Sequence, residues 1–72
     1  MMPHADLPHL LTFEDQWFTD AIAWDGTHVL HIHVDRKDGY DEVRPETPES
    51  FFARDGNDRA KAWLRDEMDR TV

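Results

Sequence analysis

The sequence predicts an α+β fold, in which a three-stranded antiparallel β-meander packs against a C-terminal α-helix. Two observations predict this arrangement. Asp-Gly pairs, which are typical of tight turns, separate β-rich segments at about 19–24, 27–36 and 40–44. Apolar side chains then recur with helical spacing between about residues 58 and 70. With 72 residues in total, we expect residues 1–72 to form a single small domain.

The pairing of the strands follows from the Asp-Gly pairs. If the pairs at 25–26 and 38–39 form two-residue turns, Asp20 lies opposite His31 in the neighbouring strand. The same geometry places His33 opposite Arg44 of the third strand.

Strand residues alternate between the two faces of a sheet, which separates the side chains of the meander into two sets. The first face is apolar and is expected to receive the C-terminal helix; it comprises Ala21, Ala23, Leu30, Ile32, Val34 and Val43. The second face combines two histidines with apolar residues, namely Phe18, Ile22, Trp24, Val29, His31 and His33. Either the N-terminal segment or another molecule is expected to cover this second face.

Two helices are expected downstream of the strands. Thr47, Pro48 and Glu49 combine a helix cap, a proline at the first helical position and an acid in the first turn, which predicts a short helical turn near 48–53. The longer helix at 58–70 presents one apolar face made by Ala60, Trp63, Leu64 and Met68.

Residues 9–18 allow two interpretations. Thr12 followed by Asp15 resembles the start of a helix, whereas the apolar residues around them would also suit a strand. We expect residues 1–11 to be a flexible segment or a cover for the second face of the sheet.

The net charge of −8 is unevenly distributed along the chain. Residues 1–35 contain no lysine or arginine, and acids balance bases from residue 58 onward, so the net charge arises from residues 1–57. An acidic field repels nucleic acids and anionic membranes and attracts basic proteins. Solubility and adaptation to high salt are simpler explanations of the same composition.

The chain contains no cysteine, which excludes disulfides, thiolate zinc sites and a cysteine nucleophile. This composition fits an intracellular, cytoplasmic protein. The N-terminal residues lack the basic and apolar regions of a signal peptide, and no stretch is apolar enough to span a membrane.

His31 and His33 form the clearest candidate for a metal site. They lie two residues apart in one strand, so both imidazoles project from the same face about 7 Å apart. With Asp20 from the neighbouring strand, and Asp35 or water as a fourth ligand, they have the chemistry to hold zinc or another divalent ion. The alternatives are exposed histidines that bind nothing, or histidines that respond to pH.

The same stretch, His-Ile-His-Val-Asp at 31–35, resembles the first five positions of the His-x-His-x-Asp-His motif of metallo-β-lactamase-fold hydrolases. The resemblance implies metal-dependent hydrolysis. It covers five residues only, because Arg36 stands where that family has its last histidine and the rest of the larger fold is missing.

Other catalytic patterns are not present in the sequence. Ser50 is the only serine and has no base at a recognisable spacing, and three isolated glycines form no phosphate-binding loop. We therefore expect a protein that is not an enzyme and that carries no cofactor.

The sequence thus favours a small acidic interaction module with a basic partner. In its sharper form, carboxylates imitate phosphates and the chain inhibits a nucleic-acid-binding enzyme by occupying its cationic groove. In size and charge the chain is similar to phage-encoded inhibitors, which would act in the host cytoplasm. The expected partner-binding residues are Asp20, Asp25, Asp35, Asp38, Asp41, Glu42, Glu46 and Glu49, with Trp24 as an apolar anchor. A metal-binding protein and a structural homodimer, or a subunit of a larger assembly, are the alternatives.

Overall fold

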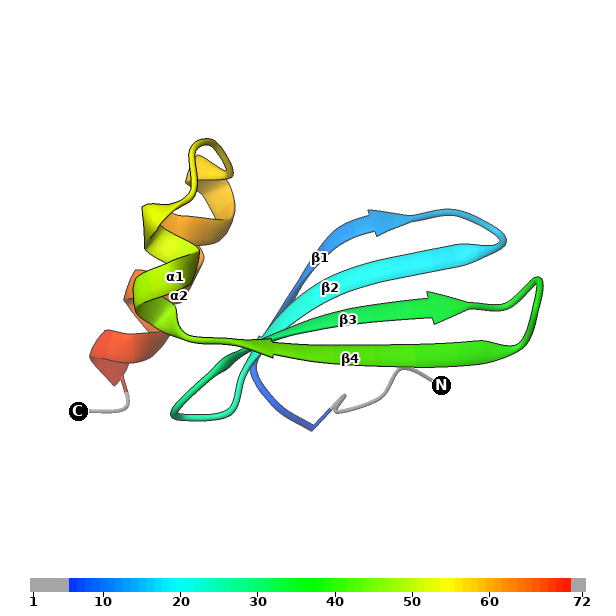
Figure 1. Cartoon of the computed structure of the whole chain (residues 1–72), viewed down its shortest axis with the longest axis horizontal. Helices are drawn as coiled ribbons and strands as arrows, with labels where there is room; N and C mark the ends of the chain where they lie inside the picture. Colours follow the sequence, from blue (N-terminus) through cyan, green and yellow to red (C-terminus); the bar gives the residue numbers. More distant parts are fainter. Residues whose placement is uncertain (1–5, 71–72) are drawn as a thin grey trace.

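A computed structural model describes residues 6–70 of the chain. It contains an antiparallel sheet of four strands, followed by two helices. The elements are β1 (His9–Glu14), β2 (Phe18–Trp24), β3 (Val29–Asp35), β4 (Tyr40–Glu46), α1 (Pro48–Ala53) and α2 (Asp58–Arg70). The strands lie side by side in chain order, and both helices lie beside one end of the sheet (Figure 1). The predicted α+β class is confirmed, with four strands in place of three.

The additional strand, β1, is formed by the segment that allowed two interpretations. It pairs with β2 from His9, opposite Ala23, to Glu14, opposite Thr19, with an irregularity in the pairing between Leu11 and Phe13. Residues 9–11 therefore belong to an edge strand of the sheet. The expectation of a flexible or covering segment also concerned residues 1–8, of which residues 1–5 lie outside the described residues.

Strand pairing differs from the expectation by two residues in both hairpins. Residues 25–28 connect β2 to β3, and residues 36–39 connect β3 to β4, so each connection has four residues and not two. As a result, Asp20 pairs with His33 and not with His31. His31 pairs with Arg44, the cation that was expected opposite His33.

Aspartate side chains explain the longer turns. Asp25 Oδ1 accepts hydrogen bonds from the backbone N–H groups of Thr27 and His28, at 2.8 and 2.7 Å. Asp35 Oδ1 accepts one from the N–H of Asp38 at 2.9 Å. Because an aspartate can bond to backbone groups two or three residues ahead, it stabilises a loop that extends beyond the Asp-Gly pair.

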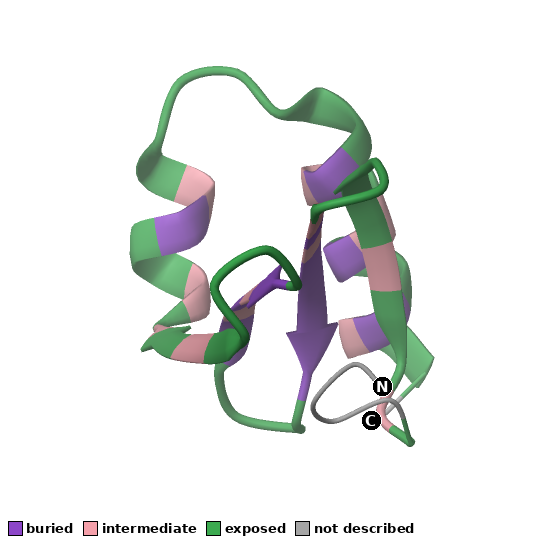
Figure 2. Ribbon diagram, turned by 90° about the vertical axis from the view of Figure 1, so that its right-hand side faces the viewer, coloured by how far each residue is buried: buried purple, intermediate pink, exposed green. Residues whose placement is uncertain are grey.

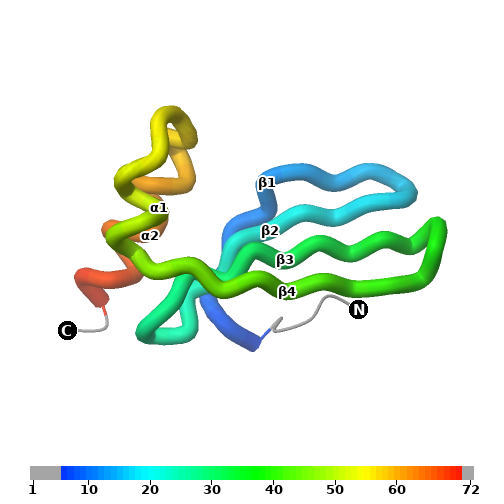
Figure 3. The backbone as a smooth tube through the Cα atoms, in the orientation of Figure 1, coloured from blue at the N-terminus to red at the C-terminus, as the bar shows by residue number. Residues whose placement is uncertain are grey.

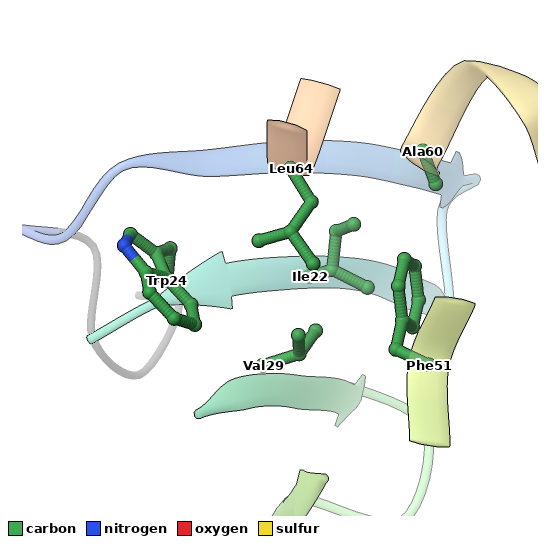
Figure 4. Close-up of a cluster of buried hydrophobic side chains, with 6 residues drawn as sticks. All are labelled: Ile22, Trp24, Val29, Phe51, Ala60 and Leu64. Atoms are coloured by element: carbon green, nitrogen blue, oxygen red, sulfur yellow. The ribbon is translucent and has the colours of Figure 1, made fainter. Parts of the chain in front are cut away.

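The helices pack on the second face of the sheet, which corrects the predicted packing. Leu64 of α2 and Phe51 of α1 join Ile22, Trp24 and Val29 in one buried cluster, and Leu64 and Val29 are fully buried (Figure 4). Glu46, at the end of β4, faces this side and accepts a hydrogen bond from Ser50 Oγ of α1 at 2.7 Å. This bond favours the return of the chain over the second face of the sheet, which carries His31 and His33.

The first face of the sheet forms a separate buried cluster. It consists of Ala21, Ala23, Leu30, Ile32 and Val34, with Leu7 and Val43 packed against it. Among the described residues, the segment before β1 therefore contacts this face through Leu7, while the helices lie on the other.

The sheet extends beyond the helices. The backbone trace in Figure 3 shows the loops 15–17 and 36–39 at the end of the sheet away from α1 and α2. Buried residues follow the central strands and the inner sides of the helices, whereas the loops are exposed (Figure 2). The described helices are too short and too polar to cross a membrane.

We predict that Leu64→Ala destabilises the protein by about 2–5 kcal/mol, because it empties a fully buried site in the contact between helix and sheet. The measurement is urea unfolding followed by circular dichroism. Leu11→Ala removes the same atoms from a side chain that is 41% exposed, and should cost about 1 kcal/mol or less. Equal losses in the two variants would contradict the packing described above.

Candidate functional site

We call the second face of the sheet, which carries His31 and His33, the histidine face. Two rows of side chains on it contain most of its polar groups. Across the strands, Asp20, His33 and Glu42 form one row, and Ile22, His31 and Arg44 form the next. The helices cover the face on the side of His31. His33 lies on the part that extends beyond them.

His33 is held by a carboxylate and by two rings. Its Nδ1 lies 2.5 Å from Asp20 Oδ1, and because an ionised carboxylate only accepts, Nδ1 carries the hydrogen. Its ring stacks on Phe18, with centroids 5.7 Å apart, and meets the Tyr40 ring at 6.2 Å. The hydrogen bond to Asp20 is the main cause that raises the pKa of His33, and it outweighs the opposing effect of desolvation.

His31 has a different carboxylate partner. Its Nε2 donates to Glu46 Oε1 at 2.7 Å, and its ring lies 6.0 Å from that of Phe51. Glu46 Oε2 accepts from Ser50 Oγ at 2.7 Å and from Arg54 Nε at 2.9 Å. The Glu46 side chain, which is only 7% exposed, thereby connects β3, β4 and α1.

The pKa of Glu46 reflects two opposing influences. Desolvation by burial raises it, but the hydrogen bonds from Ser50 and His31 and the charge of Arg54 together lower it below its ordinary value. The carboxylate is therefore ionised at neutral pH and is a poor general base. Because Ser50 Oγ donates to this carboxylate and not to a histidine, the three side chains do not form a nucleophilic triad.

Two pockets meet at His31 and Arg44. The smaller, of about 360 Å³, lies over the sheet and is also lined by Asp20, His33 and Glu42. The larger, of about 530 Å³, lies between β4 and α1 and is also lined by Thr47, Ser50 and Arg54. Each histidine therefore borders a pocket and is oriented by a carboxylate.

The predicted metal ligands His31, His33 and Asp20 are not brought together as one site. Asp20 bonds to His33, whereas His31 bonds to Glu46 and pairs across the sheet with Arg44. Within residues 6–70, no group of three or more histidine, aspartate or glutamate side chains is arranged to hold a metal ion.

The eight carboxylates expected to bind a partner fall into three groups. Asp25 and Asp35 accept hydrogen bonds from turn backbone, and Asp35 is buried, which corrects its assignment to an exposed binding surface. Asp20, Glu42 and Glu46 bond to side chains of the protein itself. The third group, Asp38, Asp41 and Glu49, is exposed and makes no ion pair with other described residues.

Trp24 was expected to anchor a partner, but it is 5% exposed and belongs to the main buried cluster. The difference follows from the packing of the helices on the histidine face. Its indole Nε1 is buried and donates to no acceptor in the described part of the chain.

Other aromatic side chains are exposed instead. Phe13, Trp17 and Tyr40 are 50%, 45% and 50% exposed, and we call these three residues the aromatic end, because they lie near the loops 15–17 and 36–39. The sequence gives little signal for them, since Phe13 and Trp17 fall in the segment 9–18 that allowed two interpretations, and Tyr40 follows an Asp-Gly pair.

Arg36 fixes the two loops at the aromatic end. Its guanidinium donates to the carbonyl oxygens of Asp15, Gln16 and Phe18, and its backbone N–H donates to the Trp17 carbonyl at 2.7 Å. The Arg36 guanidinium is therefore directed at the backbone of residues 15–18. These hydrogen bonds hold the loops that carry the exposed rings in place.

Comparison of the chain with models of protein families, with curated proteins and with solved structures finds no match.

We predict that Asp20→Asn lowers the pKa of His33, because it removes the carboxylate that favours the imidazolium. The pKa is read from the pH titration of the ring proton by NMR. Because the folded-state pKa of His33 is raised, its contribution to stability is present at low pH and is lost as the pH rises through that pKa. Asp38→Asn removes an equal charge from an exposed turn and should leave the His33 pKa almost unchanged. An equal shift in both variants would contradict the assigned pair.

Proposed function

We propose that this protein is a non-enzymatic interaction module, which binds a basic protein surface through the aromatic end of its sheet. The observation that carries the proposal is the combination of exposed rings and exposed carboxylates at this end. Trp17 and Tyr40 are both about half exposed, and Asp38 and Asp41 lie in the adjoining hairpin without ion-pair partners in the described chain.

The chemistry of this surface favours a cationic partner. Tryptophan and tyrosine are enriched among the residues that contribute most to binding, and an aromatic face attracts an arginine or lysine side chain. Carboxylates beside the rings add attraction at longer range, reinforced by the net charge of −8. The brace made by Arg36 reduces the conformational entropy that the two loops would lose on binding.

The sharper form of this proposal is nucleic-acid mimicry. A partner that binds DNA or RNA has a cationic groove, and the exposed carboxylates would occupy that groove in place of phosphates. Supporting this form is the acidity of the chain, which repels nucleic acid itself. This form also requires that DNA or RNA competes with the protein for binding to the partner.

We predict that tagged protein captures a basic partner from the native cell at low salt, and that rising salt elutes it, because the attraction is between exposed charges. The double variant Asp38→Lys and Asp41→Lys should lose the partner, and Trp17→Ala with Tyr40→Ala should weaken its retention. These side chains are exposed, so the variants should remain folded, and only Tyr40→Ala, which removes a ring contact with His33, should lower the melting temperature slightly.

The matched control is Asp66→Lys with Asp69→Lys, which makes the same change of charge on exposed positions of α2. This variant should retain the partner. Capture that survives reversal of Asp38 and Asp41, or that is equally reduced by the control, would contradict binding through the aromatic end.

A further inference from the structure

The pocket between β4 and α1 brings together several hydrogen-bond donors beside one carboxylate, Glu46. Two arginines and a histidine line it, namely Arg44, Arg54 and His31, and its volume is about 530 Å³. This volume is within the range of pockets that bind small molecules. Its lining residues come from β3, from the end of β4 and from α1 and the residues beside it, whereas the loop 36–39 lies at the opposite end of the sheet from α1 (Figure 1).

Both arginines are oriented by a carboxylate and keep further donors available. Arg44 is bonded through Nε to Glu42, and Arg54 through Nε to Glu46. Among the described residues, the terminal Nη1 and Nη2 groups of the two side chains make no hydrogen bond. A guanidinium held at Nε still presents this fork of donors, which matches the oxygens of an anion.

Two further side chains of the pocket wall, Thr47 and His31, can donate hydrogen bonds. Thr47 Oγ1 accepts a hydrogen bond from the Ser50 backbone N–H at 3.2 Å, which leaves its own hydroxyl hydrogen free to donate. His31 uses Nε2 to donate to Glu46, so Nδ1 is a second donor whenever the ring is protonated.

The carboxylate in this wall does not block an anion. Oε1 of Glu46 accepts from His31, and Oε2 accepts from Ser50 and Arg54, so both oxygens are already directed at donors of the protein. Lys61 donates to the backbone carbonyl of Arg54 and adds a further positive charge nearby.

We propose that this pocket binds a tetrahedral oxyanion, such as a phosphate or sulfate group, between Arg44 and Arg54. The four Nη groups of the two guanidinium forks and the Thr47 hydroxyl form five donor groups, whereas a carboxylate group has only two oxygens to accept from them. A group with three or four oxygens uses them better. The site is independent of the aromatic end and of the partner proposed for it.

The test is a titration of the ¹⁵N-labelled protein followed by NMR at pH 6, with sulfate as the probe and with chloride and acetate at the same ionic strength. Sulfate keeps its charge at this pH, so its effect is not confused with its own protonation. We expect saturable shifts of the Thr47 and Ser50 amides and of the arginine Nε signals. Binding by Arg44→Gln should be at least tenfold weaker, because the variant loses one of the two forks.

The Arg44 side chain is 76% exposed and forms its ion pair with Glu42 and not with Glu46, so the substitution leaves the hydrogen bonds of Glu46 in place. Arg65→Gln is the control, since Arg65 lies over the Phe52 ring and does not line the pocket. The control should bind sulfate as the unmodified protein does. Shifts no larger than those of chloride, or equal binding by Arg44→Gln, would overturn the site. Equal binding of acetate and sulfate would overturn the preference for a tetrahedral anion.

Discussion

Leu64 joins the helical layer to the sheet, because it lies in one buried cluster with Ile22 and Val29. Leu64 and Val29 are fully buried, and Phe51 and Trp24 complete the cluster around them. A chain of this size can build only a thin core, so one layer of two short helices covers one end of the sheet and no more. The remaining length of the histidine face has to be stable without a helical cover, which it achieves through ion pairs and stacked rings.

These stabilising contacts also decide which groups are available to a ligand. Asp20 and Glu46 form hydrogen bonds with His33 and His31, so these two carboxylates already have partners within the molecule. The exposed carboxylates are left at the hairpin of Asp38 and Asp41, together with the aromatic end. At the helical end, the carboxylates instead orient arginines around a pocket. The two ends of the sheet therefore expose different side chains: carboxylates and aromatic rings at one end, and arginines paired with carboxylates at the other.

The sequence predicts the elements of this fold better than their assembly. Asp-Gly pairs and the Thr47–Glu49 cap mark the ends of three strands and both helices, because these signals are local. The register depends on whether Asp25 and Asp35 bond forward to the backbone, which adds two residues to each turn. Which face receives α2 was not predictable, since both faces of β2 and β3 are apolar and the bond between Glu46 and α1 forms only in the folded chain. The exposure of the aromatic end follows from the same choice.

The packing of α2 on the histidine face is the central claim, and nuclear Overhauser effects from the methyl groups of Leu64 test it most directly. The structure predicts strong effects to the side chains of Ile22 and Val29. Strong effects to Ile32 and Val34, which lie on the other face, would contradict it. In that case the aromatic end, the histidine pairs and the pocket beside α1 would all have to be placed anew.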